Sequence, residues 1–233
     1  LAICNEILSA EAKTLYPELL RQENGSHLSF RSVRESWLGQ IFRFANPGKR
    51  RRDVEECLDG ISFITFNYDR LLEAALYSFI RYGQNIDDAN AVRILTSIPI
   101  LHAYGSLGDL ALPDNPGIEL GSKELWCVER SAKGIRTFTE EIASEHRERM
   151  VFEISRSDRI VFLGFGFHRR NLDLIMPESI SGNKHAIATG IGLRDGQLTE
   201  VKNRFARIGK EIKIFPMQCS ELIDQQREVI FGS

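Results

Sequence analysis

The sequence is poor in cysteine, with four in 233 residues. No two of them lie two to four residues apart, so the paired spacing that holds a structural zinc ion is missing. Scattered cysteines in a chain of this length also argue against a disulfide scaffold and favour reduced, buried thiols. We therefore expect a cytoplasmic protein without a metal site. The four residues are Cys4, Cys57, Cys127 and Cys219.

Long apolar runs and an excess of one charge are also missing. No apolar run approaches the roughly 18 residues that span a bilayer, and the first twenty residues have no basic segment of the kind that opens a signal peptide. Lysine and arginine number 30 against 32 acidic residues, a formal net charge of -2. A dedicated nucleic-acid binder normally carries a basic excess. We expect no membrane partner and no directly bound nucleic acid.

The chain instead shows an alternation of strand and helix patterns. Residues 1–58 have apolar residues at helical spacing, whereas residues 61–66 (ISFITF) form a short apolar run that is typical of a strand buried on both faces. Further strands are predicted at 98–102, 159–163, 185–189 and 211–215. Helices are predicted at 70–82, 134–156, 196–208 and 219–231, and residues 109–133 are predicted to be a loop. Such alternation predicts an α/β fold with a parallel sheet, helices on both faces and an N-terminal helical region.

Unusual residues follow three of the predicted strands. Ligands of an open parallel sheet bind outside the carboxyl ends of its strands. An amide, a carboxylate, an imidazole, a phenol and glycine backbone at that edge would suit a ligand with ribose and phosphate groups. The residues are Asn67, Tyr68 and Asp69; His102, Tyr104, Gly105 and Ser106; and Gly164, Phe165 and Gly166.

Each of these residues also has a structural interpretation. Asp69 equally suits an N-cap of the helix at 70–82, and Asn67 suits a turn. His102 on an apolar strand suits a hydrogen-bonded core histidine as well as a catalytic base. The chain has neither a G-x-G-x-x-G motif nor a P-loop, so no single segment is specific by itself.

Three segments in series resemble the sirtuin-like domains. FITFNYDRLLE (63–73) is similar to the TxNYDxxxE segment of that family, and LHAYGSLG (101–108) lies where the family carries an HGS segment. IVFLGFGFHRRNLDL (160–174) resembles the segment hhhhGySxxDxN, in which h is an apolar residue. The resemblance covers about residues 58–225.

The resemblance implies a single domain that binds NAD, with a helical insert at 1–58 and a Rossmann-like core at 59–233. The zinc ribbon of the deacetylating sirtuins needs a set of cysteines that this chain lacks, so a zinc-dependent deacetylase is not expected. The bacterial branch without the ribbon, often found in anti-phage defence, cleaves NAD between nicotinamide and ribose. That branch implies an NAD hydrolase that needs no metal, with a defence partner protein or an additional domain as its partner.

The resemblance also implies roles for individual residues. Asn67 would hold the ribose or position water. The nucleotide would contact a larger set of residues. One of them, Asn171, is also expected to cap a short helix through Met176. That set is Tyr68, Asp69, Gly105, Ser106, Gly164, Phe165, Gly166 and Asn171.

The sequence departs from the family pattern in four places. The family's glycine-rich opening segment, G-A-G-x-S, is expected upstream of Leu1. Tyr104 stands where the family has its catalytic histidine, and His102, two residues earlier on the same side of the strand, is the candidate base. Gly166 replaces a serine, and Arg169 replaces a common aspartate. Because a phenol is a poor base at neutral pH, Tyr104 leaves two further alternatives. One is an inactive module that binds NAD or an ADP-ribose-type nucleotide and regulates a partner, and the other is an interaction scaffold without a ligand.

Overall fold

The computed structural model describes residues 1–14, 16–21, 35–45, 54–113, 115–137, 140–177 and 184–232. The chain divides into two compact units, Leu1–Ile142 and Ala143–Ser233. Each unit is described by itself below. Among the described residues, no helix has both the length and the apolar character needed to cross a bilayer.

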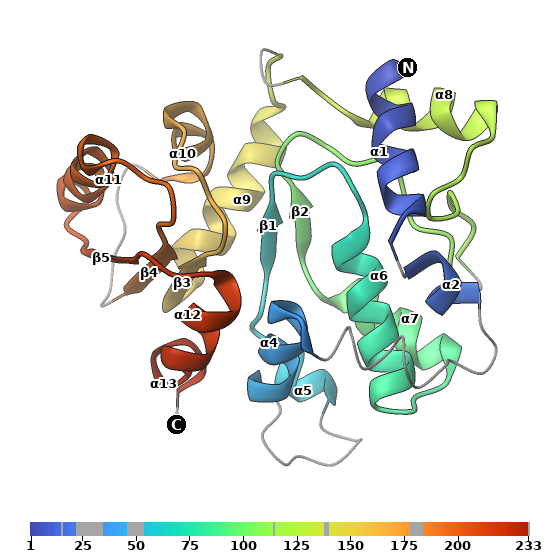
Figure 1. The fold of residues 1–233 in the computed structure, drawn as a ribbon, viewed down its shortest axis with the longest axis horizontal. Helices are drawn as coiled ribbons and strands as arrows, with labels where there is room; N and C mark the ends of the chain where they lie inside the picture. Colours follow the sequence, from blue (N-terminus) through green and yellow to red (C-terminus); the bar gives the residue numbers. More distant parts are fainter. Residues whose placement is uncertain are drawn as a thin grey trace. The chain divides into compact units, whose positions relative to one another are not determined.

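The first unit contains a parallel pair of strands joined by a helical crossover. Strand β1 (Phe63–Thr65) pairs with β2 (Ile100–His102), with Thr65 opposite His102, so the two strands end level (Figure 1). Parallel strands need a long connection, which α6 (Leu71–Ser78), the π-helical turn η2 (Phe79–Gly83) and α7 (Asp88–Ser97) provide. The other helices of this unit are α1 (Ala2–Ala12), α2 (Tyr16–Arg21), α4 (Trp37–Ala45), α5 (Val54–Leu58) and α8 (Leu125–Gly134).

Two of the apolar clusters in the first unit show how its helices pack. The larger one packs α4 and α5 against α6, η2 and α7, with the rings of Phe42 and Phe79 stacked at 4.2 Å. The smaller one packs α1 against α8 through Cys4, Leu8 and Val128. The helix α1 is therefore built into this unit through an apolar face.

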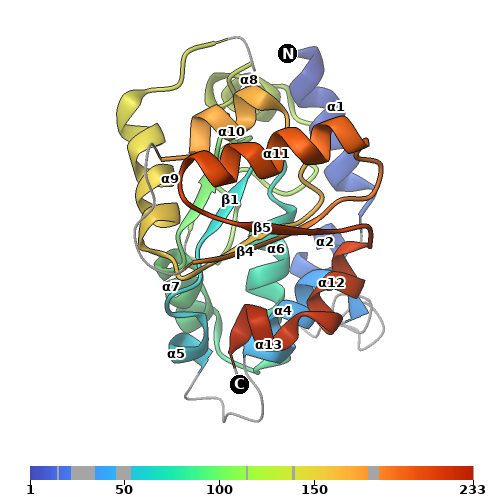
Figure 2. The same ribbon diagram turned by 90° about the vertical axis from the view of Figure 1, so that its left-hand side faces the viewer.

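The second unit is a parallel sheet of three strands in the order β3-β4-β5. Its strands are β3 (Arg159–Phe162), β4 (His185–Thr189) and β5 (Ile212–Phe215). Figure 2 shows α11 (Asp195–Arg207) on one side of these strands and α12 (Cys219–Gln225) with α13 (Arg227–Phe231) on the other. The unit also contains α9 (Ser144–Arg156) and α10 (Arg169–Ile175). Parallel strands flanked by helices confirm the predicted α/β class and are consistent with a Rossmann-like fold.

Several predicted helix boundaries are wrong. The helix predicted at 134–156 begins only at Ser144, and residues 125–133, predicted to be a loop, belong to α8. The predicted helix relied on an apolar stripe that starts at Ile135, but Ile135 lies outside the helix and pairs with Gly105 in an isolated bridge. Phe138, assigned to the same stripe, lies outside the described residues. Asn171 does not cap a helix, because α10 starts two residues earlier at Arg169.

Candidate functional site

The residues after β1 are fixed beside the residues after β2 by backbone hydrogen bonds. The N–H of Ala103 donates to the carbonyl oxygen of Thr65 at 2.8 Å, and the N–H of Leu107 donates to that of Tyr68 at 3.1 Å. The N–H of Asn67 donates to the Thr65 hydroxyl at 3.1 Å. The structure therefore brings together the predicted residues of the first two strand ends.

Asn67 presents its side-chain amide to solvent at this edge. The residue is exposed, and its amide makes no hydrogen bond to the part of the chain that the structure describes. Its backbone is held on both sides, because its N–H donates to Thr65 and its carbonyl oxygen accepts from Nδ1 of His102 at 2.8 Å. An amide with a fixed backbone and unused hydrogen-bonding groups suits ligand recognition.

His102 is buried behind Asn67, with an exposed fraction of 8%. Its Nε2 lies 2.7 Å from Oε1 of Glu73 on α6, so both ring nitrogens are engaged. Burial lowers the pKa of His102. The hydrogen bond and charge of Glu73, the Asn67 carbonyl and the charge of Asp69 together outweigh burial, so the pKa is raised. These bonds match the core-histidine interpretation that the sequence left open.

Asp69 lies half-buried at the start of α6. Its Oδ1 accepts a hydrogen bond from the N–H of Leu71 at 3.2 Å, although the N-cap position itself belongs to Arg70. Burial raises the pKa of Asp69, and the charges of Glu11 and Glu73 add to this effect, whereas the Leu71 N–H and His102 oppose it. The carboxyl thus binds the first turn of the helix from one residue before the observed N-cap, so the predicted cap at Asp69 is wrong by one residue.

Tyr68 and Tyr104 both contact the segment after α8. The Tyr68 hydroxyl donates to the carbonyl oxygen of Arg136 at 2.6 Å, and the Arg136 N–H donates to the carbonyl oxygen of Tyr104 at 2.8 Å. Burial, followed by the charges of Tyr104 and Glu140, raises the pKa of Tyr68, so its hydroxyl stays a donor. Tyr104 is buried, and its ring packs edge-on against Phe66 at 5.9 Å.

Gly105 is required by a close approach of backbone. Its φ is +81°, and a Cβ there would lie 1.9 Å from the carbonyl oxygen of Gly134. No side chain larger than hydrogen fits that distance. The next residue, Ser106, closes the turn by accepting the N–H of Gly108 on its hydroxyl at 3.3 Å. In this conformation, both residues shape the loop after β2.

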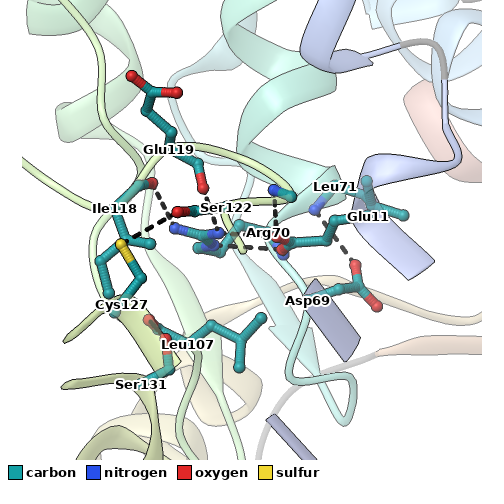
Figure 3. A network of polar contacts seen from close by, with 12 residues as sticks. Glu11, Asp69, Arg70, Leu71, Leu107, Ile118, Glu119, Ser122, Cys127 and Ser131 are labelled. Atoms are coloured by element: carbon teal, nitrogen blue, oxygen red, sulfur yellow. Dashed lines mark hydrogen bonds and ion pairs between the residues drawn. The ribbon is translucent and has the colours of Figure 1, made fainter. Parts of the chain in front are cut away.

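A buried ion pair supports the same turn and was not predicted. Arg70 and Glu11 are both fully buried, and their side chains meet at 2.7 Å and 3.2 Å (Figure 3). The Glu11 carboxylate also accepts the backbone N–H groups of Arg70 at 2.9 Å and Gly121 at 3.1 Å. The Arg70 guanidinium donates to the Ile118 carbonyl oxygen at 2.6 Å. The helix α1 is thus tied directly to the segment that carries Asn67 and Asp69.

The other predicted residues belong to the second unit, where they follow β3. Gly164 has a φ of +61°, and its N–H donates to the hydroxyl of Thr189 on β4 at 2.8 Å. The ring of Phe165 packs 5.5 Å from that of Phe162, whereas a Cβ on Gly166 would meet nothing within 4 Å. Asn171 lies within α10. At the carboxyl end of β3, the backbone of Gly164 is therefore held by a hydrogen bond, whereas Gly166 has open space where a side chain would lie.

Glu73 contacts His102 in the site, but the sequence analysis predicted no site role for it. From the sequence, Glu73 had only a favourable position in the first turn of a helix. It was visible as the last residue of the quoted NYDxxxE pattern, one turn after Asp69. Glu11 had no local signal, because its partner Arg70 is 59 residues away. Within the described ranges, no group of three histidine, cysteine, aspartate or glutamate side chains is arranged to hold a metal ion.

Comparison with known proteins identifies the family. A model of the SIR2-like domain matches residues 61–190, which is more than half of the chain. A search of curated proteins and a search of solved structures found no match. The matched span includes β1 and β2 with Asn67, Glu73 and His102, and it ends one residue after β4. The chain belongs to the SIR2-like domain family.

Proposed function

We propose that this chain binds NAD and hydrolyses the bond between nicotinamide and ribose. The observation that carries the proposal is the exposed amide of Asn67, held at the carboxyl end of a parallel strand within a SIR2-like domain. Ligands of parallel sheets bind at that edge. In this role the amide donates to and accepts from the ribose hydroxyls and the attacking water.

The proposed reaction breaks one bond and forms one. The C1′–N bond of NAD breaks, its electron pair neutralises the nicotinamide ring, and the ribose carbon develops the charge of an oxocarbenium ion. Water adds to C1′ and loses one proton, which gives nicotinamide, ADP-ribose and H⁺. Because the leaving group departs as a neutral molecule, the cleavage depends mainly on orientation and on stabilising the developing cation.

The other predicted residues support binding in this proposal. Tyr68, Asp69, Gly105 and Ser106 lie in the segments after β1 and β2, which backbone hydrogen bonds hold together in the first unit. For Gly164, Phe165, Gly166 and Asn171, contact with the nucleotide stays a prediction. His102 and Tyr104 are the predicted candidates for the base. The setting that we propose is the cytoplasm of a bacterium, in anti-phage defence, with a partner protein or an additional domain as the activator.

The test is nicotinamide release from NAD by the full-length protein. Turnover that is lost in Asn67→Ala supports the proposal. Asn203→Ala is the matched control, because Asn203 is an exposed asparagine on α11. An Asn67→Ala variant that releases nicotinamide as fast as the Asn203→Ala variant would contradict the role of Asn67.

A second function is favoured by one observation, the buried Tyr104 in place of the family's histidine. That replacement supports a module that binds NAD or an ADP-ribose-type nucleotide without cleaving it and regulates a partner. Calorimetry with NAD separates the two functions. Binding without nicotinamide release supports the regulatory module, and release with each turnover supports the hydrolase.

A further inference from the structure

A chain of three groups links α6 to the backbone of Asn67. Oε1 of Glu73 lies 2.7 Å from Nε2 of His102, and Nδ1 of His102 lies 2.8 Å from the carbonyl oxygen of Asn67. The second carboxylate oxygen of Glu73, Oε2, is buried and makes no hydrogen bond to the described residues. His102 is therefore the group that anchors this carboxylate.

The two distances fix how many protons the chain of groups carries. A carbonyl oxygen can only accept, so Nδ1 of His102 must carry a hydrogen. The contact between Nε2 and Glu73 also needs a hydrogen, either on the imidazole or on the carboxyl. Glu73 and His102 together thus hold one proton more than a neutral histidine beside an ionised carboxylate. Without that proton, the Nε2 lone pair would face a carboxylate oxygen at hydrogen-bonding distance.

We propose that Glu73 is a positioning residue, which shares a proton with His102 and thereby fixes the carbonyl, and hence the amide, of Asn67. This inference rests on the proposed function, in which Asn67 orients ribose and water. His102 acts through its hydrogen bond to the Asn67 backbone and not as the base. When the shared proton is lost, the imidazole keeps a single N–H and cannot hold Glu73 and the carbonyl of Asn67 at the same time, so the link between them is broken.

The charges around the pair agree with this assignment. Asp69 is the other carboxyl whose charge reaches His102, and it favours the protonated pair. Arg70, the cation that follows Asp69 in the chain, is occupied by Glu11 and by carbonyl oxygens. The phenols of the site, Tyr68 and Tyr104, carry no positive charge in either protonation state.

The pH dependence distinguishes positioning from general-base catalysis. The pKa of His102 is raised in the folded protein, so its contribution to folding is complete below pH of about 6.5 and is lost as the pH rises through the folded-state value. Turnover falls through the same window, by about tenfold per pH unit once the pair has lost its proton. A histidine base would give the opposite slope, because it must be deprotonated to act.

Glu73→Gln is the informative variant. The glutamine amide can donate to a neutral Nε2, which keeps Nδ1–H on the Asn67 carbonyl without the extra proton. We expect the variant to lose the fall in turnover at high pH. Glu55→Gln is the matched control, since Glu55 is an exposed glutamate that pairs with Arg93, and it should keep the wild-type profile.

Side-chain ¹⁵N NMR on the wild-type protein tests the proton directly and needs no turnover. The chain has five histidines, and His102→Gln assigns the signal. We expect both ring nitrogens of His102 to be protonated at pH 6 and the backbone signal of Asn67 to shift as His102 titrates. A His102 with an unprotonated Nε2 beside an ionised Glu73 carboxylate at pH 6, the latter read from the carboxyl ¹³C signal, or an Asn67 signal that ignores the titration, would overturn the inference. A failed NAD assay alone would contradict the proposed function and leave these two signals to decide the positioning role.

Discussion

The buried pair of Arg70 and Glu11 gives a quantitative prediction about the stability of the first unit. Replacing Arg70 with methionine keeps most of the apolar stem but leaves the Glu11 carboxylate without its cation. Both side chains are buried, with exposed fractions of 1% and 0%. The Ile118 carbonyl oxygen also loses one of its two donors and keeps the Ala111 N–H.

The magnitude follows from this burial. Removing one partner of a buried ion pair costs about 3–5 kcal/mol, because an uncompensated charge stays in a low-dielectric environment. With a urea slope of about 2 kcal/mol/M, the unfolding midpoint should fall by roughly 1.5–2.5 M. The helix α1 should be affected together with α6, because Glu11 binds the backbone at the start of α6.

Urea unfolding, followed by tryptophan fluorescence, measures this change in the first compact unit, which contains the ion pair. Both tryptophans, Trp37 and Trp126, lie in Leu1–Ile142. Arg93→Met is the matched control, because Arg93 makes a two-pronged pair with Glu55 at 2.7 Å and 3.0 Å but in an exposed position, and it should leave the midpoint unchanged. Equal midpoints for the Arg70→Met and Arg93→Met variants would refute the reasoning that burial makes the pair indispensable.

Three further outcomes are expected. Gly105→Ala should prevent folding of the loop after β2, because its Cβ would overlap the Gly134 carbonyl oxygen; a crystal structure with the loop unchanged would contradict this. Gly164→Ala should lower the midpoint of thermal unfolding, because alanine is strained at the φ of +61° that Gly164 has. Gly166→Ala should leave the midpoint unchanged, because a Cβ there meets nothing within 4 Å; equal shifts of the two variants in calorimetry would contradict this reasoning. Tyr104→His introduces the histidine that the resemblance implies at this position and should raise the rate of nicotinamide release; an unchanged rate would exclude this position as the base.

The strands were predictable because their burial leaves a direct mark on the sequence. Residues 61–66 and 159–163 are apolar and rich in β-forming residues, and β1 and β3 lie inside those runs. The alternation of these runs with helical patterns was enough for the α/β class. The helix α8 was missed because its buried face is small, namely Cys127, Val128 and Ser131, whereas its large apolar residues Leu125 and Trp126 are exposed.

The site was predictable as a set of strand ends but not as a network of bonds. Parallel strands end at one edge, so Asn67 and His102 could be expected near each other. The sequence left a base and a core histidine open at His102, because the two contacts that bear on its role, to Glu73 and to the Asn67 carbonyl, join residues that are distant in the chain. The pair of Glu11 and Arg70 joins residues 59 positions apart and has no periodic or local signal.

The most direct test of the central claim is the fate of NAD in ¹⁸O-labelled water. Full-length protein is incubated with NAD, and nicotinamide and ADP-ribose are analysed by mass spectrometry, with Asn67→Ala and Asn203→Ala in parallel. The account predicts equal amounts of the two products, one ¹⁸O atom in each ADP-ribose, none in nicotinamide, and loss of both products in Asn67→Ala alone. NAD that stays intact, or that is cleaved equally by Asn67→Ala, would contradict it.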